Sequence, residues 1–499
     1  MSFPQQQHQQ QQPPAPTTTV FVGTLIHSTG LATLDIIAPA VSGSGFSFIS
    51  YHTLPNILDV VSSFRPSSHP SSRQSPFIPP QICRLPPHSF LIPGLIDTHV
   101  HAPQYAYTGT GYTLPLLDWL TTYTFPSERK FSSLTHAQTI YPKAVARSLR
   151  CGTTTTAWYG TLHLPATKSL GQRAFVGKVC MDRNGGEGYV EPSASDSLKT
   201  TTEFITAVQS LNIDTVQPIL TPRFAVSCSS ELMKGLAHLA SQHALRIQTH
   251  CSENPAECSF IRDLFPASRD YVSVYNDHGL LTDRTVLAHC VHLSDAETTL
   301  LSETQAGISH CPVSNFALSS GVCDVRRLLD ANIKVGLGTD VAGGWSMSIV
   351  EAMRSALVAS KVVGFTQRDD AVLASLNIPK SVVEDDEAPS VRYHDPPQPH
   401  RPLTVPEVFH LATLGGARVL NISETVGNFV PGKEFDAVVV DLDAPAPAAS
   451  ETATSVMDEA RRPVTVFGHD TVATMFEKWV FLGDDRNVAR VWVKGRRVV

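Results

Sequence analysis

The chain has 499 residues, of which 42% are hydrophobic and 17% charged, and its formal net charge is −7. This length is about twice the roughly 250 residues of an ordinary eight-stranded barrel, so a small single domain is excluded. The negative net charge offers no basic surface for a polyphosphate, which argues against nucleic acid as a partner. The longest apolar runs are strand-length, so we expect no membrane-spanning segment and no membrane partner.

The first 18 residues are rich in glutamine and proline and offer almost nothing to bury, so we predict a disordered tail over 1–18. They have neither the charged start nor the apolar core of a signal peptide. The nine cysteines are scattered and include no Cys-x-x-Cys pair, a pattern typical of reduced thiols. We therefore predict a cytoplasmic protein.

From residue 19 to residue 89, β-branched and aromatic runs such as Val20-Phe21-Val22 alternate with clusters of serine, proline and glycine. This pattern predicts short antiparallel strands of a side domain.

Residues 90–420 show apolar runs that alternate with helix-period patterns, which predicts an α/β fold with a (β/α)8 barrel. The predicted strands lie near 91–99, 153–159, 173–181, 215–222, 245–250, 285–289, 306–310 and 333–339. The clearest predicted helices lie at 137–150, 197–211, 229–243 and 294–304, and Ser294 resembles a helix cap.

An acidic run at 384–387 and a proline cluster near 396 interrupt this alternation, so we predict a solvated insertion loop over 364–402. A capped helix with an early proline is predicted from Thr404. Residues 421–499 are predicted to return to the side domain as strands, with a second loop at 444–463.

The apolar run from Leu91 ends in two histidines, His99 and His101. In an extended strand residues i and i+2 point to the same side, so two imidazoles face one point, as a divalent transition metal requires. Two packed core histidines are the alternative. Four later apolar runs favour metal binding because each also ends in a ligand or acid–base group: His250 with Glu253, His289, His310 and Asp340. The carboxyl ends of barrel strands surround one mouth, so these groups are expected to meet there.

Six segments carry more specific motifs: 93–105, 114–126, 221–224, 248–253, 310–315 and 338–344. Together they resemble the metal-dependent amidohydrolase superfamily, over about residues 91–360 and again at 482–487. The run Pro115-Leu-Leu-Asp-Trp-Leu120 and the run Thr221-Pro-Arg-Phe224 resemble its guanine-deaminating branch.

This resemblance implies a barrel whose side domain is a small β-sandwich built from both chain ends. It also implies a homodimeric, zinc-dependent hydrolase of cyclic amidines that converts guanine and water to xanthine and ammonia in purine catabolism. Deamination of another aminated heterocycle is the alternative activity. A catalytically inactive scaffold is the alternative from a different class, although every expected ligand position is filled.

The implied metal ligands are His99, His101, His250 and Asp340, which leave one position for water. Three nitrogens and one carboxylate suit Zn²⁺ and also Fe²⁺. Relatives with two metals have a bridging lysine after the fourth strand, where this chain has Arg223. We therefore expect one metal ion per chain.

The implied catalytic residues are Glu253, His289 and Asp340. Asp340 would take a proton from water while His289 holds the resulting hydroxide, and Glu253 would protonate the ring nitrogen and then the leaving amine. A surface acid at a helix start is the alternative for Glu253. His310 is left open between a structural role and a substrate contact.

Three residues are predicted to bind the substrate: Gln104, Arg223 and Phe224. The planar donor fork of Arg223 fits the adjacent O6 and N7 acceptors of guanine, and a salt-bridged surface arginine is the alternative. Gln104 can both donate and accept at a purine edge, and Phe224 can stack on the ring or fill the core.

Overall fold

The computed structural model describes residues 19–31, 33–43, 49–50, 81–163, 170–375, 400–444 and 462–499. The predicted tail at 1–18 lies outside these residues, as do most of the insertion predicted at 364–402 and nearly all of the loop predicted at 444–463. None of the helices in the described ranges is both long and apolar enough to cross a membrane.

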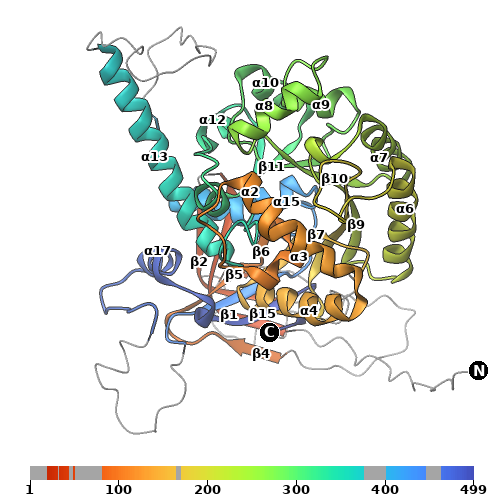
Figure 1. Cartoon of the computed structure of the whole chain (residues 1–499). Helices are drawn as coiled ribbons and strands as arrows, with labels where there is room; N and C mark the ends of the chain where they lie inside the picture. The colour runs from red at the N-terminus through yellow and green to blue at the C-terminus, as the bar shows by residue number, and fades with distance from the viewer. Residues whose placement is uncertain are drawn as a thin grey trace, which may run out of the picture.

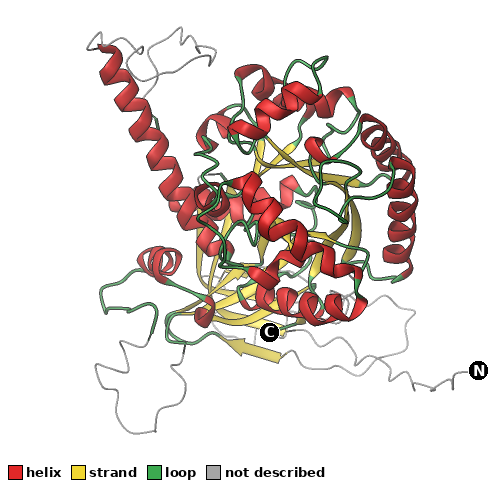
Figure 2. Ribbon diagram, viewed as in Figure 1, coloured by secondary structure: helices red, strands yellow, loops and turns green. Residues whose placement is uncertain are grey.

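Eight parallel strands form a barrel in which helices surround the sheet (Figures 1 and 2), as the alternating pattern predicts. Their order around the sheet follows the chain. The strands are β6 (Leu95–His101), β7 (Thr153–Gly160), β8 (Arg173–Cys180), β9 (Val216–Pro222), β10 (Arg246–Cys251), β11 (Thr285–His289), β12 (Gly307–His310) and β13 (Lys334–Leu337).

The first and last barrel strands meet through hydrogen bonds that bring their carboxyl ends together. The amide of Asp340 donates to the carbonyl of His99 at 2.9 Å, and the amide of His101 donates to the carbonyl of Val341 at 3.1 Å. Thr98 adds a hydroxyl hydrogen bond to the carbonyl of Leu337 at 2.8 Å. Two potential ligands, His99 and Asp340, are thereby fixed side by side.

The helices of the outer layer follow the predicted pattern. They include α4 (Leu134–Arg150), α6 (Ala194–Ser210), α7 (Ser230–His243), α8 (Pro255–Leu264), α9 (Tyr271–Asp277), α10 (Asp295–Thr304), α12 (Val325–Asp330), α13 (Ile349–Ser375), α14 (Val405–His410) and α15 (Gly416–Val419). The predicted cap of α10 is confirmed, because Ser294 and Glu297 form a reciprocal capping box. Thr404 and Glu407 do the same for α14.

Two predicted boundaries differ from the structure. The run at 91–99 is divided: β5 (Ser89–Pro93) pairs with strands of the side domain, and the barrel strand begins only at Leu95. Pro93 is the last residue of β5 and has no N–H to donate to a ladder, and the chain changes sheets directly after it. Gly94 fits at this point because a side chain there would lie 1.9 Å from the Thr154 hydroxyl. The insertion predicted from 364 begins later, because α13 continues to Ser375 through Gly364, a residue that a long helix tolerates.

The side domain is built from both ends of the chain, as the resemblance implies. Its described strands form one mixed sheet in the order β16-β15-β14-β5-β1-β2-β3, and β4 also pairs with β1. Figure 1 shows β1, β4 and β15 together beside one end of the barrel. The strands are β1 (Thr19–Gly30), β2 (Thr33–Gly43), β3 (Ile49–Ser50), β4 (Gln81–Arg84), β14 (Ala437–Asp441), β15 (Val488–Val493) and β16 (Arg496–Arg497).

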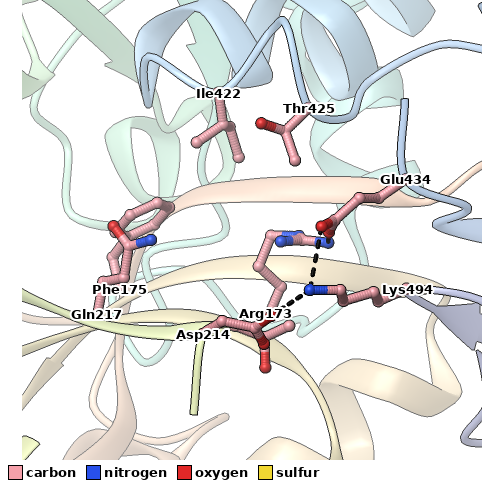
Figure 3. A pocket seen from close by; sticks show the side chains of 9 residues that line it. Arg173, Phe175, Asp214, Gln217, Ile422, Thr425, Glu434 and Lys494 are labelled. Carbon is pink, nitrogen blue, oxygen red and sulfur yellow. Dashed lines mark hydrogen bonds and ion pairs between the residues drawn. The ribbon is translucent and has the colours of Figure 1, made fainter. Parts of the chain in front are cut away.

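A cluster of ion pairs joins this sheet to the amino-terminal end of the barrel strands (Figure 3). Arg173, the first residue of β8, pairs with Asp436 at 3.0 Å and with Glu434 at 2.6 Å. Lys494 pairs with Asp214 and, at 3.2 Å, with Glu434. Because catalytic residues of such barrels lie at the opposite, carboxyl end, we assign this cluster to domain attachment.

Candidate active site

Five buried groups from four places in the barrel converge at its carboxyl end. The Nε2 atoms of His99 and His101 lie 3.1 Å and 3.3 Å from the same carboxylate oxygen of Asp340. The Nε2 atom of His101 lies 3.2 Å from that of His250. His99, His250, His289 and Asp340 each offer one potential ligand atom, and these four atoms lie within 4.8 Å of one another.

The hydrogen bonds of these histidines leave their inner nitrogens available to a cation. Nδ1 of His250 donates to the carbonyl of Arg223 at 2.6 Å, and Nδ1 of His289 donates to the side-chain oxygen of Asn315 at 2.9 Å. Both acceptors lack a proton, so each Nε2 keeps its lone pair. Nε2 of His99 and of His289 form no hydrogen bond with any described residue. A divalent metal ion would satisfy these buried nitrogens, so the donor set fits such an ion.

Burial favours the neutral form of His99 and His250, which is the form that binds a metal. It lowers the pKa of His99 to about 4 and the pKa of His250 well below its ordinary value. Burial alone would raise the pKa of Asp340, but His99 and His101 hold that pKa well below its ordinary value. The neutral imidazoles of His99 and His250 therefore lie beside an ionised carboxylate.

His289 and His101 both lie within reach of Asp340. His289, predicted as a catalytic residue, has its Nε2 atom 3.7 Å from the second oxygen of Asp340 and belongs to the four-residue set above. His101, predicted as a ligand, lies outside that set but contacts both His250 and the first Asp340 oxygen. The division of roles between these two histidines stays a proposal.

The backbone at the ends of these strands is unusual. His289 and Asp340 have φ angles of 72° and 46°, in the left-handed region that residues other than glycine seldom occupy. Such conformations cluster at functional sites because the surrounding structure must impose them. Gly338 allows the close approach of the two strand ends, since a side chain there would lie 2.9 Å from Cβ of His99.

Glu253 lies beside this cluster. Its Oε2 atom is 3.4 Å from Nε2 of His289, and its Oε1 atom accepts a hydrogen bond from Ser320 at 3.2 Å. Burial raises its pKa well above the ordinary value, and the nearby charge of Asp340 acts in the same direction. A surface acid at a helix start is excluded, because Glu253 is buried and the capping box of α8 uses Asn254 and Glu257 instead.

Arg223 is also buried, so the alternative of a surface arginine is wrong. Its Nη1 and Nη2 atoms donate to the two oxygens of Glu128 at 2.6 Å and 3.4 Å. Burial would raise the pKa of Glu128, yet Arg223 and His101 hold that pKa below its ordinary value. Gln104 donates to the same carboxylate at 2.8 Å.

Three residues that contact the predicted site residues were not predicted from the sequence: Glu128, Asn315 and Ser320. Glu128 lies on α3 (Phe125–Arg129), two residues beyond the recognised run 114–126, and no local pattern marks its carboxylate as buried. Asn315 lies within a recognised segment, but its partner His289 is remote in sequence.

One pocket brings the predicted residues together. It is lined by three members of the histidine–aspartate cluster, by Glu253, by the three predicted substrate residues and by apolar side chains: His101, Gln104, Leu116, Trp119, Leu120, Arg223, Phe224, His250, Glu253, Leu318 and Asp340. A mostly apolar cavity with a few convergent polar groups is typical of a small-molecule site. His310 is not among these residues; it is buried, neither of its nitrogens is hydrogen-bonded to a described residue, and burial lowers its pKa to about 3.

The chain is also similar to known proteins. The sequence profile of the amidohydrolase family matches residues 90–382 and 386–498. The guanine deaminase of Dictyostelium discoideum is 39% identical over 486 residues, which cover 96% of this chain and 98% of that protein. The guanine deaminase of Rattus norvegicus is 37% identical over 495 residues, with 96% of each chain covered.

Solved structures show the same similarity. The crystal structure of guanine deaminase from C. acetobutylicum with bound guanine superposes with a TM-score of 0.78 at 29% identity, covering 97% of this chain and 100% of that one. An adenosine deaminase from Xanthomonas campestris with bound zinc shares the fold, with a TM-score of 0.73 at 21% identity and 97% and 93% of the two chains covered. The chain therefore belongs to the amidohydrolase family and groups there with the guanine deaminases.

Proposed function

We propose that this chain hydrolyses guanine to xanthine and ammonia. The observation that carries the proposal is one pocket in which Arg223 and Gln104 face the same space as Glu253, His101, His250 and Asp340. The names of the relatives support guanine as the substrate. Deamination of another aminated heterocycle by the same groups is the second candidate activity.

The reaction replaces the 2-amino group of guanine with an oxygen from water. A metal ion held by His99, His101, His250 and Asp340 would lower the pKa of water and so supply the nucleophile near neutral pH. Asp340 accepts the proton that this water loses. His289 orients the attacking oxygen, because its Nε2 atom lies between the carboxylates of Glu253 and Asp340.

Glu253 performs the remaining proton transfers. It donates a proton to the ring nitrogen beside the attacked carbon, takes up the proton of the newly formed hydroxyl group, and delivers that proton to the amine as the carbon–nitrogen bond breaks and ammonia leaves. The proton held by Asp340 then returns to Glu253. Its raised pKa suits a group that must hold a proton before the attack. Phe224 packs at the pocket wall, where an aromatic ring can contact the purine face.

We propose one Zn²⁺ per chain, and the same donors also suit Fe²⁺. The support is the donor set together with Arg223, which follows β9 at the position where two-metal relatives are expected to carry a lysine. Elemental analysis of active protein is expected to find one equivalent. A requirement for two equivalents would contradict this stoichiometry.

We also propose a cytoplasmic homodimer. All nine cysteines are free thiols in the structure, which suits a reducing compartment. Val358 and Phe365 on α13 and Phe481 and Leu482 at the end of α17 (Val472–Leu482) are exposed apolar side chains of the kind that a second copy would cover. Light scattering is expected to give about twice the 54.1 kDa of one chain, and cell fractionation tests the compartment.

The activity itself is tested with purified, metal-replete protein. Guanine is expected to yield equal amounts of ammonia and xanthine, while adenine yields neither. Release of ammonia from another aminated heterocycle but not from guanine would support the second candidate. No release from any such compound at full metal content would point to an inactive scaffold.

A further inference from the structure

Glu128 is a buried carboxylate that no step of the proposed reaction uses. Its side chain is fully shielded from solvent, and each of its two oxygens accepts two hydrogen bonds. Oε2 accepts from Arg223 and from the Tyr189 hydroxyl, each at 2.6 Å, and Oε1 accepts from Gln104 at 2.8 Å and from Arg223 at 3.4 Å. A carboxylate with all these sites filled is a rigid anchor for its donors.

This anchor fixes which donors of Arg223 remain for a ligand. A guanidinium has five N–H groups, and the pairing of Nη1 and Nη2 with Glu128 takes two of them. Among the described residues the guanidinium donates to Glu128 alone, so three N–H groups stay available on a side chain that lines the pocket. Phe125, on the same helix as Glu128, lies beside the guanidinium with its ring centroid 5.3 Å away.

The same carboxylate fixes the amide of Gln104. Glu128 can only accept, so the Gln104 nitrogen must face it, and the Gln104 oxygen accepts from the backbone amide of Ala342 at 3.1 Å. The opposite orientation of the amide would oppose two acceptors at one end and two donors at the other. The second N–H of the Gln104 amide and the second lone pair of its oxygen therefore point in fixed directions at the pocket wall.

We propose that Glu128 is a positioning residue that sets the selectivity of the pocket for a 6-oxopurine. It orients the remaining Arg223 donors toward a carbonyl acceptor, and it neutralises the guanidinium, so that the site recognises hydrogen-bond geometry rather than negative charge. The inference rests on the proposed function, because it assumes that the pocket holds a purine. A ligand without the 6-oxygen would gain nothing from this orientation.

Glu128→Gln tests the proposal, because the amide keeps the shape of the side chain but replaces one acceptor with a donor. The new N–H group would face Arg223, Tyr189 or Gln104, all of which donate hydrogen bonds here. These side chains would therefore no longer be held in one orientation. Two probes of binding are hypoxanthine, which has the 6-oxygen, and purine, which lacks it. The inhibition constant of hypoxanthine is expected to rise about 10- to 150-fold, the range typical of hydrogen bonds to a charged group, while that of purine stays constant. The KM for guanine should rise more than kcat falls.

Glu407→Gln is the matched control. Glu407 forms an equally buried ion pair with Arg326 at 2.6 Å, and neither residue lines the pocket. This variant is expected to lower the melting temperature without changing either inhibition constant. Tyr189→Phe removes one hydrogen bond from Glu128 and should raise the hypoxanthine constant less, in the same direction; it carries the test if Glu128→Gln does not fold.

The outcomes separate the two proposals. Equal changes for hypoxanthine and purine in Glu128→Gln, or no change in Tyr189→Phe and Glu128→Gln, would overturn the role of Glu128. Wild-type protein that binds hypoxanthine no more tightly than purine would overturn it as well. Failure of the proposed function shows differently, as wild-type, metal-replete protein that releases no ammonia from guanine.

Discussion

Two buried arginines, Arg173 and Arg223, lie at opposite ends of the barrel strands and use their donors differently. Arg173 gives its Nε and Nη2 atoms to the two oxygens of Asp436, both at 3.0 Å, and gives Nη2 to Glu434 as well. Arg223 gives only its two Nη atoms to one carboxylate, that of Glu128. Two acidic partners hold Arg173 in place, and these ion pairs connect the barrel to the side domain. Arg223 has a single acidic partner and keeps donors for a ligand.

The comparison predicts that changes at the carboxyl end affect catalysis, whereas changes at the other end affect only stability. The largest effect is expected from Glu253→Gln, which removes the proton donor but keeps the shape of the side chain. Its kcat should fall by about 10²- to 10⁴-fold at unchanged metal content. Near-normal kcat in a metal-replete sample would refute the role. Glu297→Gln, which changes a buried acid in the capping box of α10 outside the pocket, is the control and should keep its kcat.

A smaller effect is expected from Arg223→Lys, which keeps the charge but loses the planar fork. By analogy with bidentate contacts to bases, the loss should be about 1–3 kcal/mol in kcat/KM for guanine. Arg223→Ala should cost more, and it should narrow the ratio of guanine to 2-aminopurine rates, because 2-aminopurine lacks the 6-oxygen. An unchanged ratio in that variant would place recognition on Gln104 and backbone groups.

Arg173→Met should leave kcat/KM unchanged and lower stability. The substitution leaves Asp436 buried without its cation, and breaking such a pair typically costs about 3–5 kcal/mol. Denaturant unfolding together with steady-state kinetics checks both parts. A change in KM without a change in unfolding free energy would contradict the division between the two ends.

The smallest effect on activity at neutral pH is expected at His410, which contacts Ser28 of the side sheet at 2.9 Å. Burial lowers its pKa to about 4, and the nearby charge of Arg418 acts in the same direction while Glu407 opposes it. The unfolded chain therefore binds a proton first as the pH falls, so stability should decrease between about pH 6.5 and pH 4, by roughly 3 kcal/mol in total.

His410→Gln should remove this part of the pH dependence. The measurement is the unfolding free energy of wild type and variant at pH 7 and at pH 5. Identical losses in the two proteins would show that His410 titrates normally.

The barrel could be predicted from sequence because its signals are local. Each strand is a short apolar run, and five of the eight runs end in a ligand or an acid–base group, so His250 and Asp340 could be placed at one mouth before any contact was known. The division of the run at 91–99 was not predictable in this way, since both halves are apolar and only the pairing of β5 with β14 separates them.

The partner of Arg223 was likewise beyond the sequence. Glu128 lies 95 positions away from Arg223, on a short helix whose place beside Arg223 is set by tertiary packing. Residue types alone therefore indicated that Arg223 could bind guanine, but they did not indicate which of its donors are free to do so.

The most direct test of the central claim is a crystal structure of metal-loaded Glu253→Gln protein with guanine bound. The 6-oxygen is expected to lie within about 3.2 Å of an Arg223 nitrogen and to accept one of the three N–H groups that are not donated to Glu128. The ring carbon that carries the 2-amino group is expected to face residue 253 and the histidine cluster. A guanine whose 6-oxygen contacts only Gln104 or backbone amides, with Arg223 bound to Glu128 alone, would contradict the account.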